Sequence, residues 1–187
     1  MKNTLKLIEE YVAEGKQEKA DKDFFLDCQK CGDLLSRKCL QAHFTSSAFI
    51  INQTHDKVLC IYHNIYKSWG WVGGHADGDD DMLYVARKET MEETSLKDFR
   101  ALDEKPIAID ALSVFSHYKN GKFVPSHVHL NVTFLFESDE NQYIHIQENE
   151  NSQIAWLTFD ELLEKSTEKH MIPVYKKIIS KIKKMGF

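Results

Sequence analysis

The chain has 187 residues, a formal net charge of −5 and a pI near 6.0, and 42% of its residues are hydrophobic. This length and composition fit one globular domain with a sizeable core, and they exclude a disordered chain. The acidic balance argues against nucleic acid as a partner, and no apolar run is long enough for a membrane span or a signal peptide, so we expect a cytoplasmic protein without a membrane partner.

Residues 1–43 are predicted to form an amino-terminal helical extension to a second unit over residues 44–187. The pattern favours two helices in the extension, over 4–14 and 21–40. The role of this extension stays open between a helical cap, a homodimer contact and a substrate lid.

Cysteines in the extension suggest a zinc site at first sight, because their spacing is C-x2-C-x7-C-x3-H. The residues in this pattern are Cys28, Cys31, Cys39 and His43. Two of these cysteines also fall on an apolar helical stripe, where cysteine behaves as a small hydrophobic residue. A continuous helix would also leave no turn to bring Cys39 back to the first pair. We therefore expect core thiols rather than a zinc site.

The second unit opens with a hairpin signal: two β-rich runs, 47–52 and 57–63, flank a polar turn. A loop rich in glycine and aspartate is expected over 64–81. Further strands are predicted at 107–117, 127–138 and 153–159.

Three helices are expected among these strands. The first covers about 79–94, and the second begins at a capping box formed by Thr158 and Glu161. The last has Pro173 in its first turn, and its five lysines between residues 176 and 184 are predicted to be solvated. The sum is a mixed α/β domain.

The helix over 79–94 carries Glu89, Glu92 and Glu93 at spacings i, i+3 and i+4. These acids continue the apolar stripe of Met82 and Val85 instead of lying on the opposite face. Each like-charge pair costs about 0.2–0.5 kcal/mol, and the carboxyl end of a helix disfavours anions. A bound divalent cation explains both features, because hard cations take oxygen ligands.

The segment before this helix, WVGGHADGDDD, contains two consecutive glycines, Gly73 and Gly74. Glycines let the backbone approach a ligand closely, and an exposed carbonyl can complete the shell of a cation. Alone, the pair would indicate only a tight turn. The sequence has neither G-x4-G-K-[ST] nor G-x-G-x-x-G, so the common nucleotide-binding loops lose support.

Residues 74–96, GHADGDDDMLYVARKETMEETSL, resemble the box of the Nudix hydrolase family, G-x5-E-x7-R-E-U-x-E-E-x-G-U, without gaps. Gly74 matches the first glycine, and Glu89, Glu92 and Glu93 match the glutamates of the catalytic helix. The GGHADGD stretch is similar to a bacterial branch of the family, and the likeness extends over about 43–167. Four positions depart from the pattern: Asp80, Lys88, Thr90 and Ser95 replace glutamate, arginine, an aliphatic residue and glycine.

The resemblance implies an α/β/α sandwich on a mixed β-sheet that hydrolyses a diphosphate bond in a nucleoside diphosphate linked to another moiety. It implies Mg²⁺ or Mn²⁺ as the cofactor, held by Glu89, Glu92, Glu93 and the Gly73 carbonyl. Family members take their general base from a box glutamate or from a loop before a late strand. The second arrangement points to Glu150 or its neighbour Glu148, which are equally well interpreted as solvated loop acids.

Gly74, His75 and Trp69 are candidates for substrate binding. His75 follows the glycine pair and is placed to touch a phosphate, and Trp69 offers a ring for stacking on a base. His127 and His129 alternate in a predicted strand and so share one face. A structural or surface role is the simpler interpretation of each histidine.

Three functions are compatible with these residues. Hydrolysis of a small nucleotide-type substrate is the leading hypothesis. A Nudix-like ligand-binding or regulatory domain without turnover is the alternative, supported by the altered box positions. An isomerase of allylic diphosphates would need a catalytic cysteine beside a metal-binding histidine cluster, and Cys60 with His63 is weak support for it.

Overall fold

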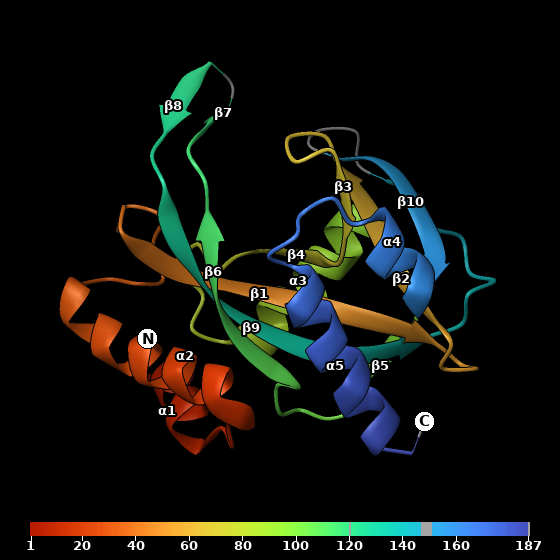
Figure 1. Ribbon diagram of the computed structural model, residues 1–187, viewed down its shortest axis with the longest axis horizontal. Coiled ribbons are helices and arrows are strands. Elements are labelled where there is room, and N and C mark those ends of the chain that lie inside the picture. Colours follow the sequence, from red (N-terminus) through yellow and green to blue (C-terminus); the bar gives the residue numbers. More distant parts are fainter. Residues whose placement is uncertain (120, 147–150, 187) are drawn as a thin grey trace.

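The computed structural model describes residues 1–119, 121–146 and 151–186 (Figure 1). Its helices are α1 (Lys2–Glu10), α2 (Gly15–Cys28), the short η1 (Gln29–Cys31), α3 (Met82–Thr94), α4 (Phe159–Lys165) and α5 (Ile172–Lys184). The strands are β1 (Ala42–Asn52), β2 (Lys57–His63), β3 (Ser68–Gly70), β4 (Val72–His75), β5 (Phe99–Ala101), β6 (Ala108–Val114), β7 (His117–Lys119), β8 (Lys122–Val124), β9 (His127–Ser138) and β10 (Asn151–Thr158).

A mixed eight-stranded sheet forms the centre of the molecule, with the order β10-β2-β1-β9-β5. Strands β3, β4 and β6 pair with β2, β1 and β9. The long strands β1 and β9 are parallel and in register from Ala42 opposite Val128 to Asn52 opposite Ser138, while their other pairings are antiparallel. The central strands are rich in β-branched and aromatic residues and almost wholly buried, as expected for strands covered on both faces.

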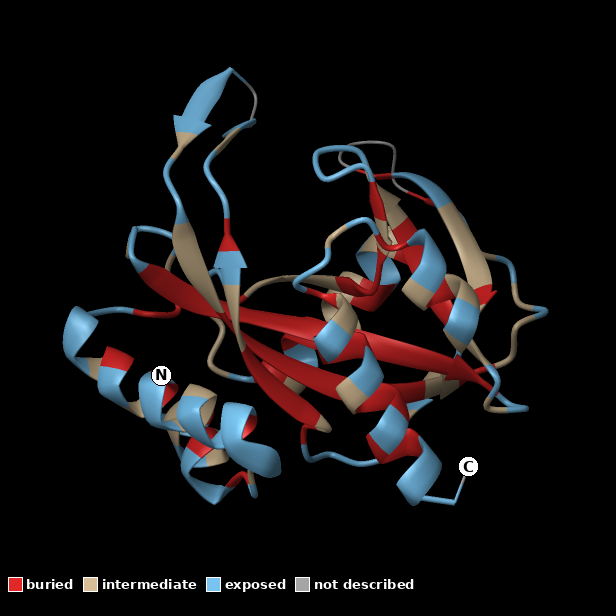
Figure 2. Ribbon diagram, in the orientation of Figure 1, coloured by how far each residue is buried: buried red, intermediate tan, exposed pale blue. Residues whose placement is uncertain are grey.

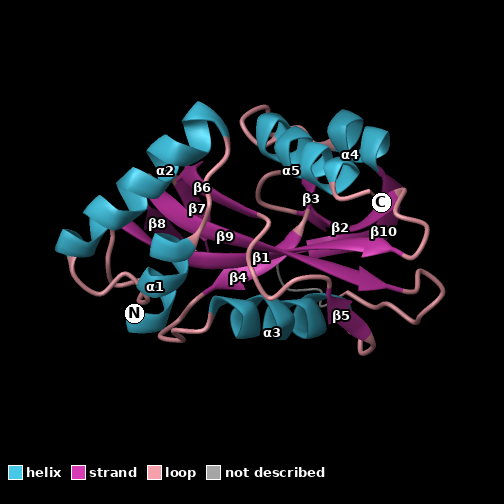
Figure 3. Cartoon of the chain, turned by 90° about the horizontal axis from the view of Figure 1, so that it is seen from below, coloured by secondary structure: helices cyan, strands magenta, loops and turns pink. Residues whose placement is uncertain are grey.

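Helices cover both faces of this sheet, which confirms the α/β class (Figure 3). Helix α3 lies on one face, and α4 and α5 lie on the other. Two hydrophobic clusters fill the layers. One contains Met82 and Val85 of α3, and the other contains Ile178 and Ile182 of α5. Figure 2 shows that the buried positions concentrate in the sheet between them. No helix in the described part of the chain is both long enough and apolar enough to cross a membrane.

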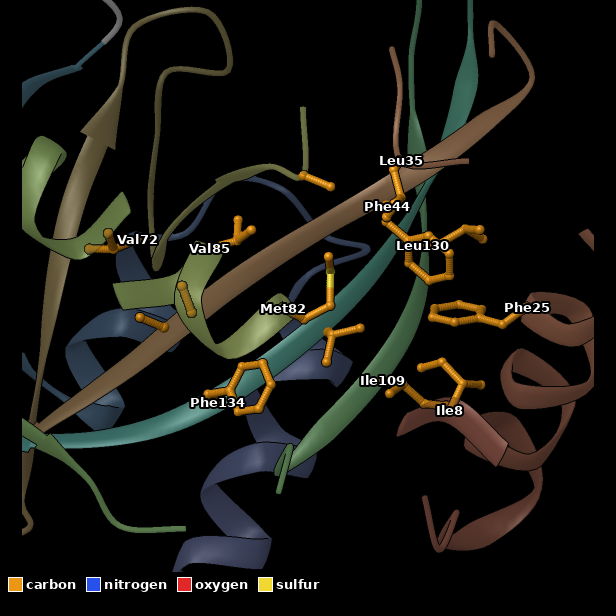
Figure 4. Packing of buried hydrophobic residues seen from close by; sticks show 14 of the residues in the cluster. Ile8, Phe25, Leu35, Phe44, Val72, Met82, Val85, Ile109, Leu130 and Phe134 are labelled. Carbon is orange, nitrogen blue, oxygen red and sulfur yellow. The ribbon is translucent and has the colours of Figure 1, made fainter. Parts of the chain in front are cut away.

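The amino-terminal helices share the core of the α3 face. Ile8 and Phe25 are fully buried, and the Phe25 ring meets Phe44 of β1 edge-on at 5.9 Å between centroids. Figure 4 shows the two helical side chains facing Phe44, Leu130 and Ile109 of the sheet. The extension is therefore packed into the same hydrophobic cluster as the box helix.

The predicted helix over 21–40 was wrong in its second half. Helix α2 ends at Cys28, and Gly32 takes a φ of 106°, which favours glycine and turns the chain away. The chain then folds back, so that the Cys39 thiol lies 3.8 Å from the Cys31 carbonyl. The premise of a continuous helix was thus incorrect. Cys28 is buried as expected, but Cys31 is exposed.

Most other elements follow the predictions, including the 47–52 and 57–63 hairpin, the strand over 127–138 and the capping box at Thr158. Within the predicted loop over 64–81, the short strands β3 and β4 were missed. The prediction of solvated lysines was wrong for Lys181, whose Nζ lies 2.9 Å from both carboxylate oxygens of buried Glu18. This ion pair joins α5 to α2.

Candidate active site

One cavity of about 720 Å³ opens where β1, β4, β9 and α3 meet. Its lining includes Glu89, Glu92 and Glu93, the glycine pair, and histidines from three strands. The amino-terminal segment contributes Arg37 and Leu40, and the connection from β6 to β9 contributes Phe115 and Phe123.

Helix α3 brings the three glutamates to the cavity because its caps and apolar face fix its position. The Tyr84 N–H donates to Asp81 Oδ1 at 3.0 Å at the first turn, and Met82, Val85 and Ala86 are buried against the sheet. Ser95 ends the helix with a φ of 58°, which is the left-handed cap expected at the position where the box has glycine.

Glu93 is held by two donors at the edge of the cavity. The Gly73 N–H donates to Glu93 Oε2 at 3.1 Å, and the Asn151 side-chain amide donates to Oε1 at 2.9 Å. These bonds orient the carboxylate toward the glycine pair. Asn151 was not among the predicted site residues, because a lone asparagine at the start of a strand carries no sequence signal of its own.

Glu89 faces the backbone of Gly74. A Cβ built on Gly74 would clash with the Glu89 carboxyl group, so a larger residue here would displace this carboxyl group from its place. Burial raises the pKa of Glu89, and the nearby negative charge of Glu92 raises it further. The structure thus places a half-buried carboxyl group, crowded by a second one, directly beside the glycine pair.

The altered box positions have their own partners. The Asp80 carboxylate accepts hydrogen bonds from the Asn3 and Thr4 N–H groups at 2.9 Å and pairs with the Met1 amino group at 2.7 Å. Buried Thr90 satisfies its hydroxyl by donating to the Ala86 carbonyl at 2.8 Å. These departures change local structure while leaving the three glutamates in place.

Polar side chains of the sheet lie next to the glutamates. The Thr45 and Ser47 hydroxyls donate to Asn131 Oδ1 at 2.9 and 2.8 Å, and all three residues line the cavity. A Cβ on Gly73 would come within 2.6 Å of Ser47 Oγ, so the glycine lets β4 lie close to β1. These three polar residues were not predicted as part of the site, because small polar residues that alternate along a strand also fit a solvent-facing surface.

A cluster of four histidines, in ring contact with one another, lies in the lining of the same cavity: His43, His75, His127 and His129. The expectation that His127 and His129 share a face is confirmed, since their Nε2 atoms are 3.2 Å apart. Burial lowers the pKa of His129 far below its ordinary value, and the adjacent His75 and His43 add to the shift. His43 had been considered only with the cysteines, because its neighbours from β4 and β9 are distant in sequence.

A charged pair lies at the cavity as well. Arg37 binds Asp77 through two parallel bonds, Nε to Oδ1 and Nη2 to Oδ2, both 2.7 Å long. Both side chains are about half exposed. Arg37 places a guanidinium, a good ligand for phosphate, in the lining contributed by the amino-terminal segment.

Some predicted residues lie elsewhere. Trp69 packs edge-on against Tyr62, and Trp71 is the tryptophan in the cavity lining. Glu148 and Glu150 fall outside the described residues. Cys60 is fully buried in the cluster under α5, and burial raises the pKa of its thiol. Among the described residues that line the cavity there is no cysteine.

Comparison with known proteins agrees with this geometry. A family model described as the NUDIX domain matches residues 42–178. A C. elegans Ap4A hydrolase binary complex is 15% identical, with a TM-score of 0.57, over 77% of this chain and 98% of that one. The E. coli dihydroneopterin triphosphate pyrophosphohydrolase is 14% identical, with a TM-score of 0.54, over 73% and 94%. At these identities the likeness concerns the fold. No curated protein matches the chain in sequence.

Proposed function

Because the chain belongs to the NUDIX family, we propose that it hydrolyses a diphosphate bond in a small nucleotide-type compound, using a divalent cation. The observation that carries the proposal is that Glu89, Glu92 and Glu93 line one cavity, with Glu89 and Glu93 directly at the glycine pair. The fold neighbours support the same class, since their names describe an Ap4A hydrolase and a triphosphate pyrophosphohydrolase.

The donor set fits Mg²⁺ or Mn²⁺. Three carboxylates supply the oxygen ligands that hard cations prefer, and the raised pKa of Glu89 reflects negative charge crowded into a half-buried place. Glu89, Glu92, Glu93 and the Gly73 carbonyl would hold the ion. When bound, it would supply Lewis-acid polarisation of a phosphoryl oxygen and a more acidic water.

The residues of the chain have distinct tasks in this proposal. Glu93 is oriented by Gly73 and Asn151, which limits its motion and fixes one ligand direction. Gly74 leaves room for Glu89, whose carboxyl group therefore lies beside the glycine pair. A general base is also required, and we propose that a box glutamate or Glu150, the alternative that the sequence suggested, takes this role.

Arg37 supports a phosphorylated substrate from the other side. Its guanidinium is bound to Asp77 at the cavity and is exposed enough to meet a ligand. His75, directly after the glycine pair, lines the same space. A substrate with more than one phosphate would reach both groups while its diphosphate bond lies at the glutamates.

The alternatives are less well supported. A binding domain without turnover would not need the donors that orient Glu93. The histidine cluster would suit an isomerase of allylic diphosphates. However, no cysteine is found among the described residues that line the cavity, and such an isomerase would need one for catalysis.

The test measures release of phosphate-bearing products from nucleoside diphosphate sugars, dinucleoside polyphosphates and nucleoside triphosphates, with Mg²⁺ or Mn²⁺. We expect metal-dependent turnover of at least one class, lowered by about 100-fold or more in Glu93→Gln, in line with the effects of removing electrostatic groups from active sites. The matched control is Glu164→Gln, which makes the same change at an exposed residue of α4.

Equal loss in both variants would point to damage unrelated to the site. A folded, metal-binding protein with no turnover on any class would contradict the hydrolase and favour the binding domain.

A further inference from the structure

The histidines of this cluster, His43, His75, His127 and His129, come from three strands that the sheet places side by side. His43 of β1 lies directly opposite His129 of the parallel strand β9, and His127 lies two residues before it on the same face. His75 ends β4, which pairs antiparallel with β1 at Thr45. The convergence is therefore built by strand register and does not depend on a loop conformation.

The rings are close enough to share one ion. Potential ligand atoms of His43, His75 and His129 all lie within 4.8 Å of one another. The His43 ring centroid is 4.9 Å from that of His127, and the two Nε2 atoms of His127 and His129 are 3.2 Å apart. Two nitrogens bound tetrahedrally to zinc at about 2.0–2.1 Å are separated by roughly 3.3 Å.

Backbone carbonyls fix which nitrogen of two rings is available. His43 Nδ1 is 3.1 Å from the Cys39 carbonyl, and His127 Nδ1 is 2.9 Å from the Pro125 carbonyl. A carbonyl only accepts, so Nδ1 must carry the proton, and the Nε2 of each neutral ring then has a lone pair. This is the arrangement in which outer hydrogen bonds orient metal-binding histidines.

His43 Nε2 adds an independent observation. The side chain is 95% buried, and this nitrogen has no hydrogen-bond partner among the described residues. Buried polar atoms normally have a partner. A hydrogen bond between His127 and His129 would account for those two rings without a ligand, but it leaves His43 Nε2 unexplained.

We propose that His43, His75 and His129, joined by His127, form a second metal site that takes a borderline transition cation such as Zn²⁺. Imidazole nitrogens suit Zn²⁺, Co²⁺ and Ni²⁺, whereas Mg²⁺ prefers the oxygens of the three glutamates. The two sites open into one cavity. The cation is thus placed to contact a ligand in that cavity, and the proposal holds whether or not the chain is a hydrolase.

The test is titration of the metal-free protein with Co²⁺, followed by visible absorption. Cobalt bound by several nitrogens at low coordination number absorbs far more strongly than the six-coordinate ion held by water and carboxylates. We expect one equivalent of Co²⁺ to give the strong bands, and one equivalent of Zn²⁺ to abolish them while Mg²⁺ does not.

Variants assign the bands to the cluster. His43→Phe and His129→Phe keep a ring but remove its nitrogens, and each should reduce the strong absorption at least tenfold. His145→Phe, which makes the same change at an exposed histidine outside the cluster, should leave it unchanged. Glu92→Gln should also keep the bands, which separates this site from the glutamates.

A weak six-coordinate spectrum with the unaltered protein would overturn the proposal, as would strong bands that survive in both phenylalanine variants. If the variants fail to fold, protection of histidines from diethyl pyrocarbonate in the unaltered chain decides the matter. Zn²⁺ should protect His75, His127 and His129, which are partly exposed, but not the exposed His145. Equal labelling of these four with and without Zn²⁺ would contradict the site.

Discussion

Glu137 illustrates how a single carboxylate joins three segments of the fold. It lies in β9 opposite Arg100 of β5, whose Nη2 donates to Oε1 at 2.7 Å. On its other side His55, in the turn after β1, lies 2.6 Å from Oε2. The Glu137 side chain is only 12% exposed, whereas the Arg100 side chain is 73% exposed. These bonds hold the pKa of Glu137 below its ordinary value, the His55 bond contributing most and Arg100 adding to it.

We predict that Glu137→Gln lowers the free energy of unfolding by about 1–2 kcal/mol at pH 7, as expected for loss of hydrogen bonds to a charged group. Because the pKa of Glu137 is lower in the folded state than its unfolded value of about 4.5, the charged carboxylate stabilises the fold at pH values above 4.5. This stabilisation is lost as the pH falls through the pKa of the folded state. The difference from the unaltered protein should therefore shrink below pH 4.5 in urea titrations.

Glu104→Gln is the matched control at an exposed position, and it should change the free energy of unfolding little at either pH. If Glu137→Gln lowered the free energy of unfolding by the same amount well below pH 4, the residue would contribute through its shape and not through its charge.

Residue by residue, the sequence predicted the acids of the site better than their partners. Three glutamates at i, i+3 and i+4 on an apolar stripe are a local pattern, so Glu89, Glu92 and Glu93 could be found without a fold. Asn151 lies 58 residues from Glu93, and Arg37 lies 40 residues from Asp77. No periodicity relates such positions, because tertiary folding alone brings them together.

Among the elements, α1 is held in place by a residue outside it. The Asp80 carboxylate accepts from the first backbone N–H groups of this helix, at Asn3 and Thr4, and from the Thr4 hydroxyl at 2.6 Å. Although desolvation opposes the charge, the amino terminus and the Thr4 bonds keep the pKa of Asp80 far below its ordinary range. Asp80 thus caps α1 across space, and Asp81 caps α3 next to it.

We predict that Asp80→Asn costs about 1–2 kcal/mol and releases α1 before the rest of the molecule, because a charged cap and its ion pair are lost. Hydrogen exchange should speed up at the amides of residues 5–10, while α5 keeps its protection. Asp79→Asn, one residue earlier, is the control that should leave exchange in α1 unchanged. Equal protection of α1 in both variants would contradict the capping role.

Element boundaries were predictable where a cap or a periodic pattern marks them. The Thr158 capping box occurs as expected. The apolar helical stripe through the cysteines was misleading, because the chain leaves α2 at Cys28 and turns at Gly32, and Leu35 is buried beyond the helix. Burial of a loop residue mimics helical periodicity when the loop packs on the sheet.

For the whole molecule, residues 1–41 belong to the core and do not merely precede it. Ile8, Phe25 and Leu34 are fully buried, and the Phe44 N–H donates to the Leu34 carbonyl at 2.8 Å. Complete burial of each large apolar side chain contributes about 1.5–3 kcal/mol. We therefore expect the predicted boundary after residue 43 to mark a change of secondary structure within one shared core.

We predict that a chain beginning at residue 42 does not unfold cooperatively, since its exposed sheet face would lack its cover. Circular dichroism during heating, compared with the full chain, measures this. A sharp transition for the shortened chain would contradict the shared core and support an independent unit over 44–187.

Two neighbouring substitutions provide a milder version of the same comparison. Phe25→Ala should cost about 3–5 kcal/mol, whereas Phe24→Ala, at a side chain 41% exposed, should cost far less. If both substitutions lowered the free energy of unfolding by similar amounts, burial of Phe25 would not be what the helices contribute to stability.

The parallel pairing of β1 with β9 has a consequence for synthesis on the ribosome. The partners lie 86 residues apart and match along all of β1, so the centre of the sheet cannot close until residue 138 has left the exit tunnel. Contacts this distant in sequence slow folding. In the first half of the nascent chain β1 can pair with β2 and β4, but its other edge has no partner until β9 is made. We expect this apolar segment to be the one that chaperones meet first.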